Sequence, residues 1–180
     1  MINADHPLPA GSDVPTLGVE EEFLVVDPDT GLPVPAAGDV VELANRSGGD
    51  LQPDLTRYLV ENNTPVCRTV GEVRGHLLSA RSVAASAALR SGARLLAVGV
   101  PLAGPMGQQF SDSDRYRRIG RDYGMLAAEH GVCGCHVHVA VPDRETAVQV
   151  CNHLRPWLPV LLALTANSPI HQGLDTRYAS

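Results

Sequence analysis

The residues with the clearest chemical potential are two histidines, His136 and His138, which lie within residues 132–141. Apolar residues alternate with other residues along this segment, a pattern typical of a half-buried β-strand. The two imidazoles then share one strand face and lie roughly 6–7 Å apart at the backbone, close enough to serve one polar site. For an isolated His-x-His pair, the competing interpretation is a solvent-exposed sheet face that happens to carry histidines.

Residues 16–26 supply three adjacent carboxylates, Glu20, Glu21 and Glu22, inside a run of apolar β-forming residues. Glutamate is depleted in strands, and a buried carboxylate without a partner is costly. Strand alternation places Glu20 and Glu22 on one face and Glu21 on the other. A solvated edge strand is the alternative, but carboxylates and imidazoles held on rigid strands are the ligands that a divalent cation needs. Together the two segments predict a metal site.

A thiolate zinc site is a further possibility, because Cys133 and Cys135 precede the histidines. Their spacing is not of the Cys-x2-Cys type, and no second ligand pair follows at the distance found in zinc fingers. Strand alternation also predicts that both cysteines point away from the histidine face. We therefore expect an oxygen-rich site instead.

Composition excludes several function classes. The net charge of −6 without a basic cluster argues against nucleic acid as a partner. All fourteen cationic residues are arginines, which excludes a P-loop lysine and a Schiff-base lysine. No segment reaches the ~18 apolar residues of a membrane span, and the first residues lack the pattern of a signal peptide. The four cysteines do not resemble a disulfide framework, so we expect a reduced, cytoplasmic protein.

The pattern predicts a loose tail over residues 1–15 and a single domain over 16–180. Strands are expected at 16–26, 54–65, 94–100 and 132–141, and helices at 69–90, 114–130 and 144–155. Residues 35–53 read as a short apolar segment followed by a loop, and the arginine-rich start of the helix at 114–130 reads as a solvated face with one possible anion contact. These elements predict an α+β fold, an antiparallel sheet with helices on one face and the site on the other.

Four motifs in fixed order carry a resemblance to a known family: Gly-Val-Glu-Glu-Glu-Phe at 18–23, Val-Glu-Asn-Asn-Thr-Pro-Val-Cys at 60–67, Cys-Gly-Cys-His-Val-His-Val at 133–139, and Arg-Pro-Trp-Leu-Pro with Ala-Asn-Ser-Pro at 155–169. The chain resembles the carboxylate–amine ligase family of bacterial type 2 glutamate–cysteine ligases from about residue 16 to residue 180. The resemblance implies part of a glutamine synthetase-like antiparallel funnel, which binds ATP and Mg²⁺ or Mn²⁺. The family has a longer chain whose second half adds strands, so this chain would be truncated at its C-terminus.

The resemblance also implies roles for individual residues. It assigns the metal ligands to five of them: Glu20, Glu22, Glu61, His136 and Asp54. It assigns contact with the ATP phosphates to His138. Glu21 is a weaker candidate for the nucleotide site, because strand alternation turns it to the other face.

The implied reaction transfers the γ-phosphoryl group of ATP to a substrate carboxylate, and an amine then attacks the acyl phosphate to give an amide. Glutamate and cysteine would be the substrates, in glutathione biosynthesis, without nucleic-acid or membrane partners. An unfinished sheet leaves strand edges unpaired, so self-association is possible. Two alternatives stay open: an inactive metal- or nucleotide-binding remnant or interaction module that lacks half of the active site, and a metal-dependent hydrolase that uses the same carboxylates.

Overall fold

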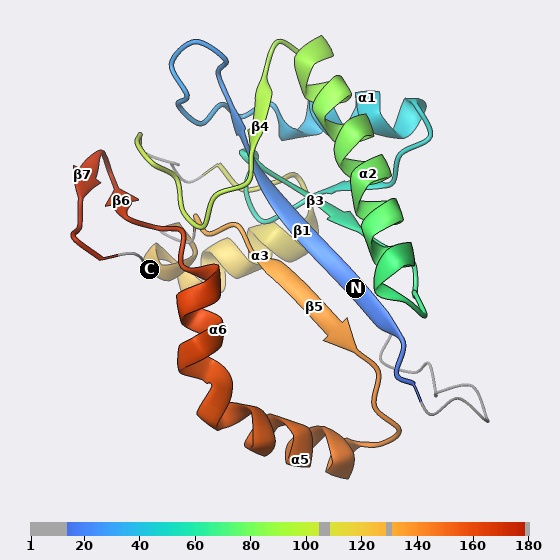
Figure 1. Ribbon diagram of the computed structural model, residues 1–180. Coiled ribbons are helices and arrows are strands. Elements are labelled where there is room, and N and C mark those ends of the chain that lie inside the picture. Colours follow the sequence, from blue (N-terminus) through green and yellow to red (C-terminus); the bar gives the residue numbers. More distant parts are fainter. Residues whose placement is uncertain (1–13, 105–108, 129–130, 179–180) are drawn as a thin grey trace.

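The computed structural model describes residues 14–104, 109–128 and 131–178. Its centre is an antiparallel sheet with helices packed on one face, which confirms the predicted α+β class (Figure 1). Five strands form this sheet: β1 (Leu17–Val26), β2 (Leu51–Pro53), β3 (Leu59–Asn63), β4 (Arg94–Leu96) and β5 (Cys135–Val139).

Strand β1 is the longest and lies in the middle of the sheet. One of its edges pairs with β3, which in turn pairs with β2. Its other edge is shared, because β5 pairs with the first half of β1 and β4 pairs with its last three residues. All these pairings are antiparallel, so the predicted glutamate strand and the predicted histidine strand are direct neighbours.

Two helices, α1 (Ala37–Arg46) and α2 (Val70–Arg90), cover one face of the sheet. Phe23, Val25 and Val60 project from the strands into a core that Val40 of α1 and Ala84 of α2 complete. The alanine-rich half of α2 suits this packing because small side chains let a helix approach a sheet closely.

Helix α2 starts at the predicted place, where the Thr69 hydroxyl accepts a hydrogen bond from the Glu72 amide. The Glu72 carboxylate accepts one from the Arg68 amide, so it satisfies a donor one residue before the cap. This pair of bonds fixes the entry to the helix.

Several boundaries differ from the sequence-based expectations. Residues 35–53 contain helix α1 and strand β2 where we expected a short apolar segment and a loop. The predicted strand at 54–65 is shortened to β3, and the one at 94–100 to β4. The predicted helix at 114–130 is divided into α3 (Asp114–Tyr123) and α4 (Met125–Ala128), because Gly124 adopts a φ of 52° that ends the first helix.

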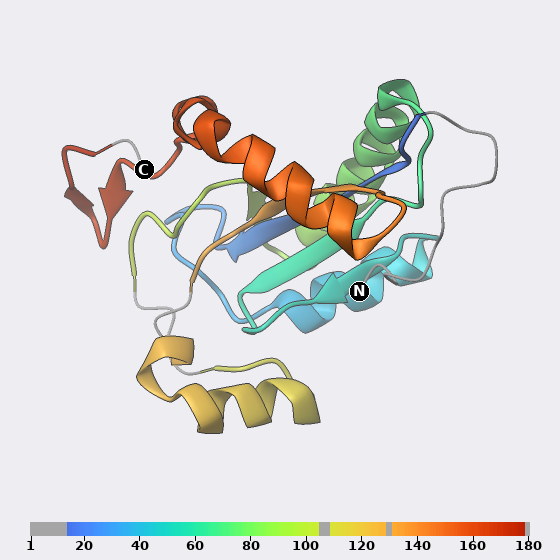
Figure 2. The ribbon, with the colours of Figure 1, turned by 90° about the horizontal axis from the view of Figure 1, so that it is seen from below.

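The last part of the chain forms α5 (Arg144–Leu154), the short helix η1 (Arg155–Trp157), α6 (Leu158–Thr165), and a small hairpin of β6 (Ile170–His171) and β7 (Leu174–Asp175). Figure 2 shows α3 and α4 on the far side of the molecule from α2. In the described residues no helix combines the length and apolar character needed to cross a membrane.

Candidate active site

The strand register brings the predicted carboxylates and histidines onto one sheet face. Glu20 lies opposite His136, and Gly18 lies opposite His138, in the pairing of β1 with β5. Glu20 Oε2 is 3.2 Å from His136 Nδ1 and also 3.2 Å from His138 Nε2. Because Gly18 has no side chain, the imidazole of His138 can reach past it to the carboxylate of the next residue on the same face.

The two imidazoles and the carboxylate differ in accessibility. The side chain of Glu20 is only 14% exposed, whereas those of His136 and His138 are 57% and 43% exposed. The two rings are edge-on to each other, with centroids 6.4 Å apart. The carboxylate therefore forms the floor of the site and the imidazoles form its open side.

Glu22 is held in place by the residue that precedes β5. Its Oε2 accepts a hydrogen bond of 2.7 Å from the Gly134 amide, and its own amide donates one of 3.0 Å to the Gly134 carbonyl. A Cβ added at Gly134 would lie 2.9 Å from His136 Nε2 and 3.3 Å from Glu22 Oε1. The absence of a side chain at Gly134 is thus what leaves room for the His136 ring and the Glu22 carboxylate beside this residue.

Strand β3 adds Glu61 and Asn63 to the same face. Glu61 lies directly opposite Glu22, and Asn63 lies opposite Glu20. Asn63 Nδ2 donates to Glu61 Oε1 over 3.2 Å, while Asn63 Oδ1 is buried and accepts no hydrogen bond in the described structure. Two carboxylates in direct cross-strand register repel each other unless a cation lies between them. The face therefore combines excess negative charge with an unpaired hard oxygen.

A cavity of about 510 Å³ borders this face and extends to α3 and α4. Glu22, Asp54, Gly134 and His136 line its polar side, and the rest of its wall comes from Leu55, Arg115, Tyr116, Ile119, Tyr123, Leu126, Ala127 and Val132. The cavity therefore has an acidic side, formed by Glu22 and Asp54, and a largely apolar wall that carries the guanidinium of Arg115. A small polar molecule with an apolar part fits such a space.

Burial, and after it the charge of the carboxylates, raises the pKa values of two neighbouring groups. Burial raises the pKa of Tyr116, and the charges of Asp54, Glu61 and Glu22 raise it further against the opposing effect of Arg115. Burial, followed by the charges of Glu22 and Asp54, raises the pKa of Cys133 to about 12. Negative charge close to the cavity disfavours further anions and favours cations.

Glu21 lies apart from these residues, as strand alternation indicated. It is 6% exposed and faces α2, where Arg81 Nε donates to Glu21 Oε2 over 2.9 Å and a second guanidinium nitrogen pairs with Oε1. The bond to Glu21 raises the pKa of Arg81. Because its carboxylate is bonded on the opposite face, Glu21 is not brought together with the other predicted site residues, and its assignment as a nucleotide contact stays a prediction.

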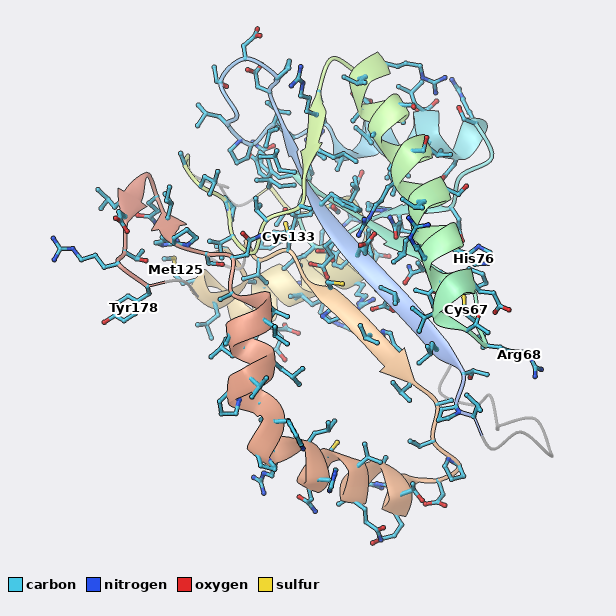
Figure 3. All side chains as sticks on the ribbon, viewed as in Figure 1. Cys67, Arg68, His76, Met125, Cys133 and Tyr178 are labelled. Atoms are coloured by element: carbon cyan, nitrogen blue, oxygen red, sulfur yellow. The ribbon has the colours of Figure 1, made fainter. Side chains whose placement is uncertain are left out.

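The cysteines follow the predicted orientation only in part. Cys135 lies opposite Glu21 and so points away from the histidine face, as expected. Cys133 instead packs with Leu24, Val26 and Leu59, next to the acidic residues, at the place where the histidine strand meets β1 (Figure 3). The alternation fails at Cys133 because β5 begins only at Cys135.

No three His, Cys, Asp or Glu side chains among the described residues are grouped so that they could hold a metal ion. The carboxylates are bound within the protein instead, since Glu20 contacts the imidazoles and Glu22 bonds to the Gly134 amide. The donor types still suit a hard divalent cation, because the face offers carboxylate oxygens, an unpaired amide oxygen and imidazoles. The individual metal roles remain predictions.

Sequence reasoning missed the contribution of Arg115 and Tyr116, which line the cavity from the first turn of α3. The arginine-rich start of α3 could not be resolved from sequence into separate roles. In the structure Arg117 pairs with Asp112 and Asp114 at an exposed position, while Arg115 lies at the cavity with its guanidinium carbon 5.5 Å from the Tyr116 ring centroid.

Comparison with known proteins gives consistent matches. The family model described as glutamate-cysteine ligase family 2 matches residues 16–180. A Nocardia farcinica protein named as a glutamate–cysteine ligase 2-1 is 55% identical over 93% of this chain and 44% of its own length. A Salinispora tropica protein named as a glutamate–cysteine ligase 2 is 48% identical over 96% of this chain and 46% of its own length. The chain therefore spans less than half the length of these relatives.

Two solved structures share the fold at low sequence identity. A Francisella tularensis glutamate–cysteine ligase in complex with AMP superimposes with a TM-score of 0.53 and 17% identity, over 81% of this chain and 30% of that one. A bifunctional glutathione synthetase from Pasteurella multocida gives a TM-score of 0.51 and 18% identity, over 79% of this chain and 19% of that one.

Proposed function

This chain belongs to glutamate-cysteine ligase family 2, and from that premise we propose that it supplies the strands of an ATP-dependent carboxylate–amine ligase site that joins glutamate to cysteine. The observation that carries the proposal is the polar sheet face, where Glu20 lies between His136 and His138 and Glu22 lies opposite Glu61. That face lies on the side of the sheet away from α1 and α2, and its two imidazoles are exposed to solvent.

Five residues would hold one or more Mg²⁺ or Mn²⁺ ions: Glu20, Glu22, Glu61, His136 and Asp54. The like charges of Glu22 and Glu61 in direct register and the unpaired Asn63 oxygen support this assignment. A bound cation would neutralise charge on the phosphates of ATP. Most of these residues lie on β1, β3 and β5, so the sheet would hold the cation rigidly in place.

His138 would contact the phosphates, because its exposed ring lies at the open side of the site beside Glu20. The Francisella tularensis ligase, which shares the fold, is described in complex with AMP, and this supports nucleotide binding here. Arg115 lines the cavity wall, where its guanidinium could pair with a carboxylate or phosphate group.

The proposed reaction proceeds in two displacements. The γ-phosphoryl group passes from ATP to the substrate carboxylate, which releases ADP and leaves an acyl phosphate. The amine, after loss of a proton, attacks the acyl carbon; phosphate leaves and an amide forms. No protein nucleophile takes part, so catalysis rests on positioning and electrostatic stabilisation.

The cavity of about 510 Å³ is the proposed place of the amino-acid substrate, because it joins the carboxylate face to an apolar wall. A role in glutathione biosynthesis follows if glutamate and cysteine are the substrates. All four cysteines are free thiols, which supports a reducing, cytoplasmic compartment as part of the proposal. We also propose that the chain can form a homo-oligomer.

An assay of ADP formation tests the reaction type. The chain is incubated with Mg²⁺ and ATP, first alone, then with glutamate, and then with glutamate and cysteine. A ligase forms ADP only when the amino acids are present and releases one amide for each ADP. ADP formation that does not depend on amino acids would contradict the proposal and indicate a hydrolase.

A further inference from the structure

A second cavity lies where helix α1 begins. Its volume is about 530 Å³, and none of the residues that line it lines the cavity beside the histidines. Its wall includes the first turn of α1, Arg57 from the turn between β2 and β3, and residues 110–112. We call it the α1 cavity. The proposed ligase reaction uses none of these residues.

Backbone hydrogen bonds hold the three segments around the α1 cavity together. The Ala37 amide donates to the Arg57 carbonyl over 3.0 Å, and the Arg57 amide donates to the Gln109 carbonyl over 2.8 Å. The Ser111 amide donates to the Leu55 carbonyl over 3.0 Å. The cavity is therefore bounded by backbone segments whose relative positions are fixed.

The N-terminus of the ten-residue helix α1 presents unpaired backbone donors to this cavity. The N-cap residue Ala36 makes no side-chain hydrogen bond to the helix. The amides of Gly38 and Asp39 donate to no acceptor within the described residues. A Cβ added at Gly38 would meet nothing within 4 Å, so a ligand can approach this part of the backbone closely. Unpaired amides at the positive end of a helix favour a bound anion.

Two side chains at the cavity add to this preference. Arg57 is exposed, and its guanidinium forms no ion pair with any other residue that the structure describes. Ser111 is only 4% exposed, and its hydroxyl has no hydrogen-bond partner in the same part of the chain. A buried hydroxyl without a partner is costly, and a molecule bound in the adjoining cavity would supply the missing hydrogen bond.

Acidic residues also line the α1 cavity and limit its positive charge. Arg117 pairs with Asp112 and Asp114, and both aspartate side chains are almost fully exposed, so water screens their charge. Asp39 is also exposed and belongs to the first turn of α1. Its carboxylate is therefore the charge that most directly opposes an anion at the helix N-terminus.

We propose that the α1 cavity binds a small oxyanion, the carboxylate or phosphate group of a small molecule. The oxyanion accepts hydrogen bonds from the Gly38 and Asp39 amides and from the Ser111 hydroxyl. The Arg57 guanidinium pairs with its charge. The volume of about 530 Å³ leaves room for the rest of the molecule beside Phe110.

This site does not depend on the proposed ligase function. Binding at the α1 cavity can be measured whether or not the chain forms an amide bond, so failure of one proposal leaves the other standing.

The test is a titration of the isotope-labelled 180-residue chain with sodium phosphate and, separately, with sodium acetate. Amide resonances in NMR spectra report binding, and sodium chloride at equal ionic strength is the reference. We expect saturable shifts at Gly38 and Asp39. Shifts with phosphate alone would assign a phosphate group, shifts with acetate alone would assign a carboxylate, and either result supports the proposal.

Arg57→Met should weaken binding about tenfold or more, because it removes the charged partner of the oxyanion. Arg68→Met is the matched control and should leave binding unchanged. Both arginines are exposed, lie between elements, and form no ion pair within the described chain. Arg68 lies beside the start of β1 (Figure 3), whereas Tyr58, next to Arg57, bonds to Val25 near the end of β1.

Two further variants separate recognition of the oxyanion from a general effect of charge. Ser111→Ala keeps the net charge and should weaken binding about threefold. It should not lower stability, because the hydroxyl has no partner to lose among the described residues. Asp39→Asn should tighten binding about threefold at low ionic strength, because it removes the opposing charge.

Three results would overturn the proposal. One is the absence of saturable shifts at Gly38 and Asp39 with either anion, in a chain that circular dichroism shows to be folded. Another is equal weakening by Arg57→Met and Arg68→Met, which would indicate unspecific attraction to positive charge. The third is weaker binding by Asp39→Asn, which would mean that the cavity recognises a cationic group.

Discussion

Glu20 and His136 face each other across the pairing of β1 with β5, with 3.2 Å between Glu20 Oε2 and His136 Nδ1. The residues are 116 positions apart in the sequence. The same oxygen is 3.2 Å from His138 Nε2, so one carboxylate connects both histidines. This contact joins the two strands whose carboxylates and imidazoles predicted a metal site.

Replacing Gly134 by alanine should disturb the site without removing a polar group. The added Cβ would lie 2.9 Å from His136 Nε2, so the imidazole must move or the strand must shift. We expect a loss of stability of about 1 kcal/mol and a weaker response to Mg²⁺ and ATP. Urea denaturation measures the first effect and calorimetric titration the second.

Gly75→Ala is the control for this change. Gly75 lies inside α2, and a Cβ added there meets nothing within 4 Å. Alanine should stabilise the helix by about 0.5–1 kcal/mol and leave ligand binding unchanged. If both alanine variants bound Mg²⁺ and ATP like the unmodified chain, the role of Gly134 in placing His136 would be wrong.

Arg81→Met should destabilise the fold, because it leaves the buried carboxylate of Glu21 without its cation. Breaking a buried pair costs about 3–5 kcal/mol, but the Arg81 side chain is half exposed and water screens the interaction. We therefore expect a loss of about 2 kcal/mol in urea denaturation. Adding Glu21→Gln should recover part of this loss, and a double variant less stable than Arg81→Met would count against the explanation.

Cys133 should react slowly with iodoacetamide. Burial and nearby carboxylates raise the pKa of its thiol to about 12, so at pH 8 almost none of it is the reactive thiolate. Cys151 lies exposed on α5 and should be alkylated at least about tenfold faster, as followed by mass spectrometry of peptides. Glu22→Gln removes one of the charges that raise this pKa, so it should speed the labelling of Cys133. Equal labelling rates at the two cysteines in the unmodified chain would contradict this description.

The site face could be predicted from sequence because strands have a simple period. Alternation alone placed Glu20 with Glu22 and His136 with His138, and the register confirms each pair on one face. The same rule placed Glu21 on the opposite face of the sheet. Its partner Arg81 could not be inferred, because it lies 60 residues further along the sequence. Alternation fails where a strand ends, and Cys133 was misplaced for that reason.

Helix α1 was missed although a signal was present. Val40, Val41, Leu43 and Ala44 follow the spacing of an amphipathic helix, but Ala36 at the N-cap offers no side-chain hydrogen bond to mark its start. The cavity wall was missed for another reason. It depends on where α3 lies relative to the sheet, and no local pattern around Arg115 and Tyr116 encodes that position.

The most direct test of the central claim is calorimetric titration of ATP with Mg²⁺ into the folded chain and into a Glu20→Ala, His136→Ala double variant. The matched control is Glu42→Ala, His76→Ala, which removes one carboxylate from an exposed position on α1 and one imidazole from an exposed position on α2. Figure 3 labels His76 on α2. We expect Mg²⁺-dependent ATP binding in the unmodified chain and in the control, and its loss in the Glu20→Ala, His136→Ala variant. Binding that persists unchanged in this variant would show that the nucleotide site lies elsewhere, and absence of binding by the folded, unmodified chain would contradict a nucleotide site built from these strands.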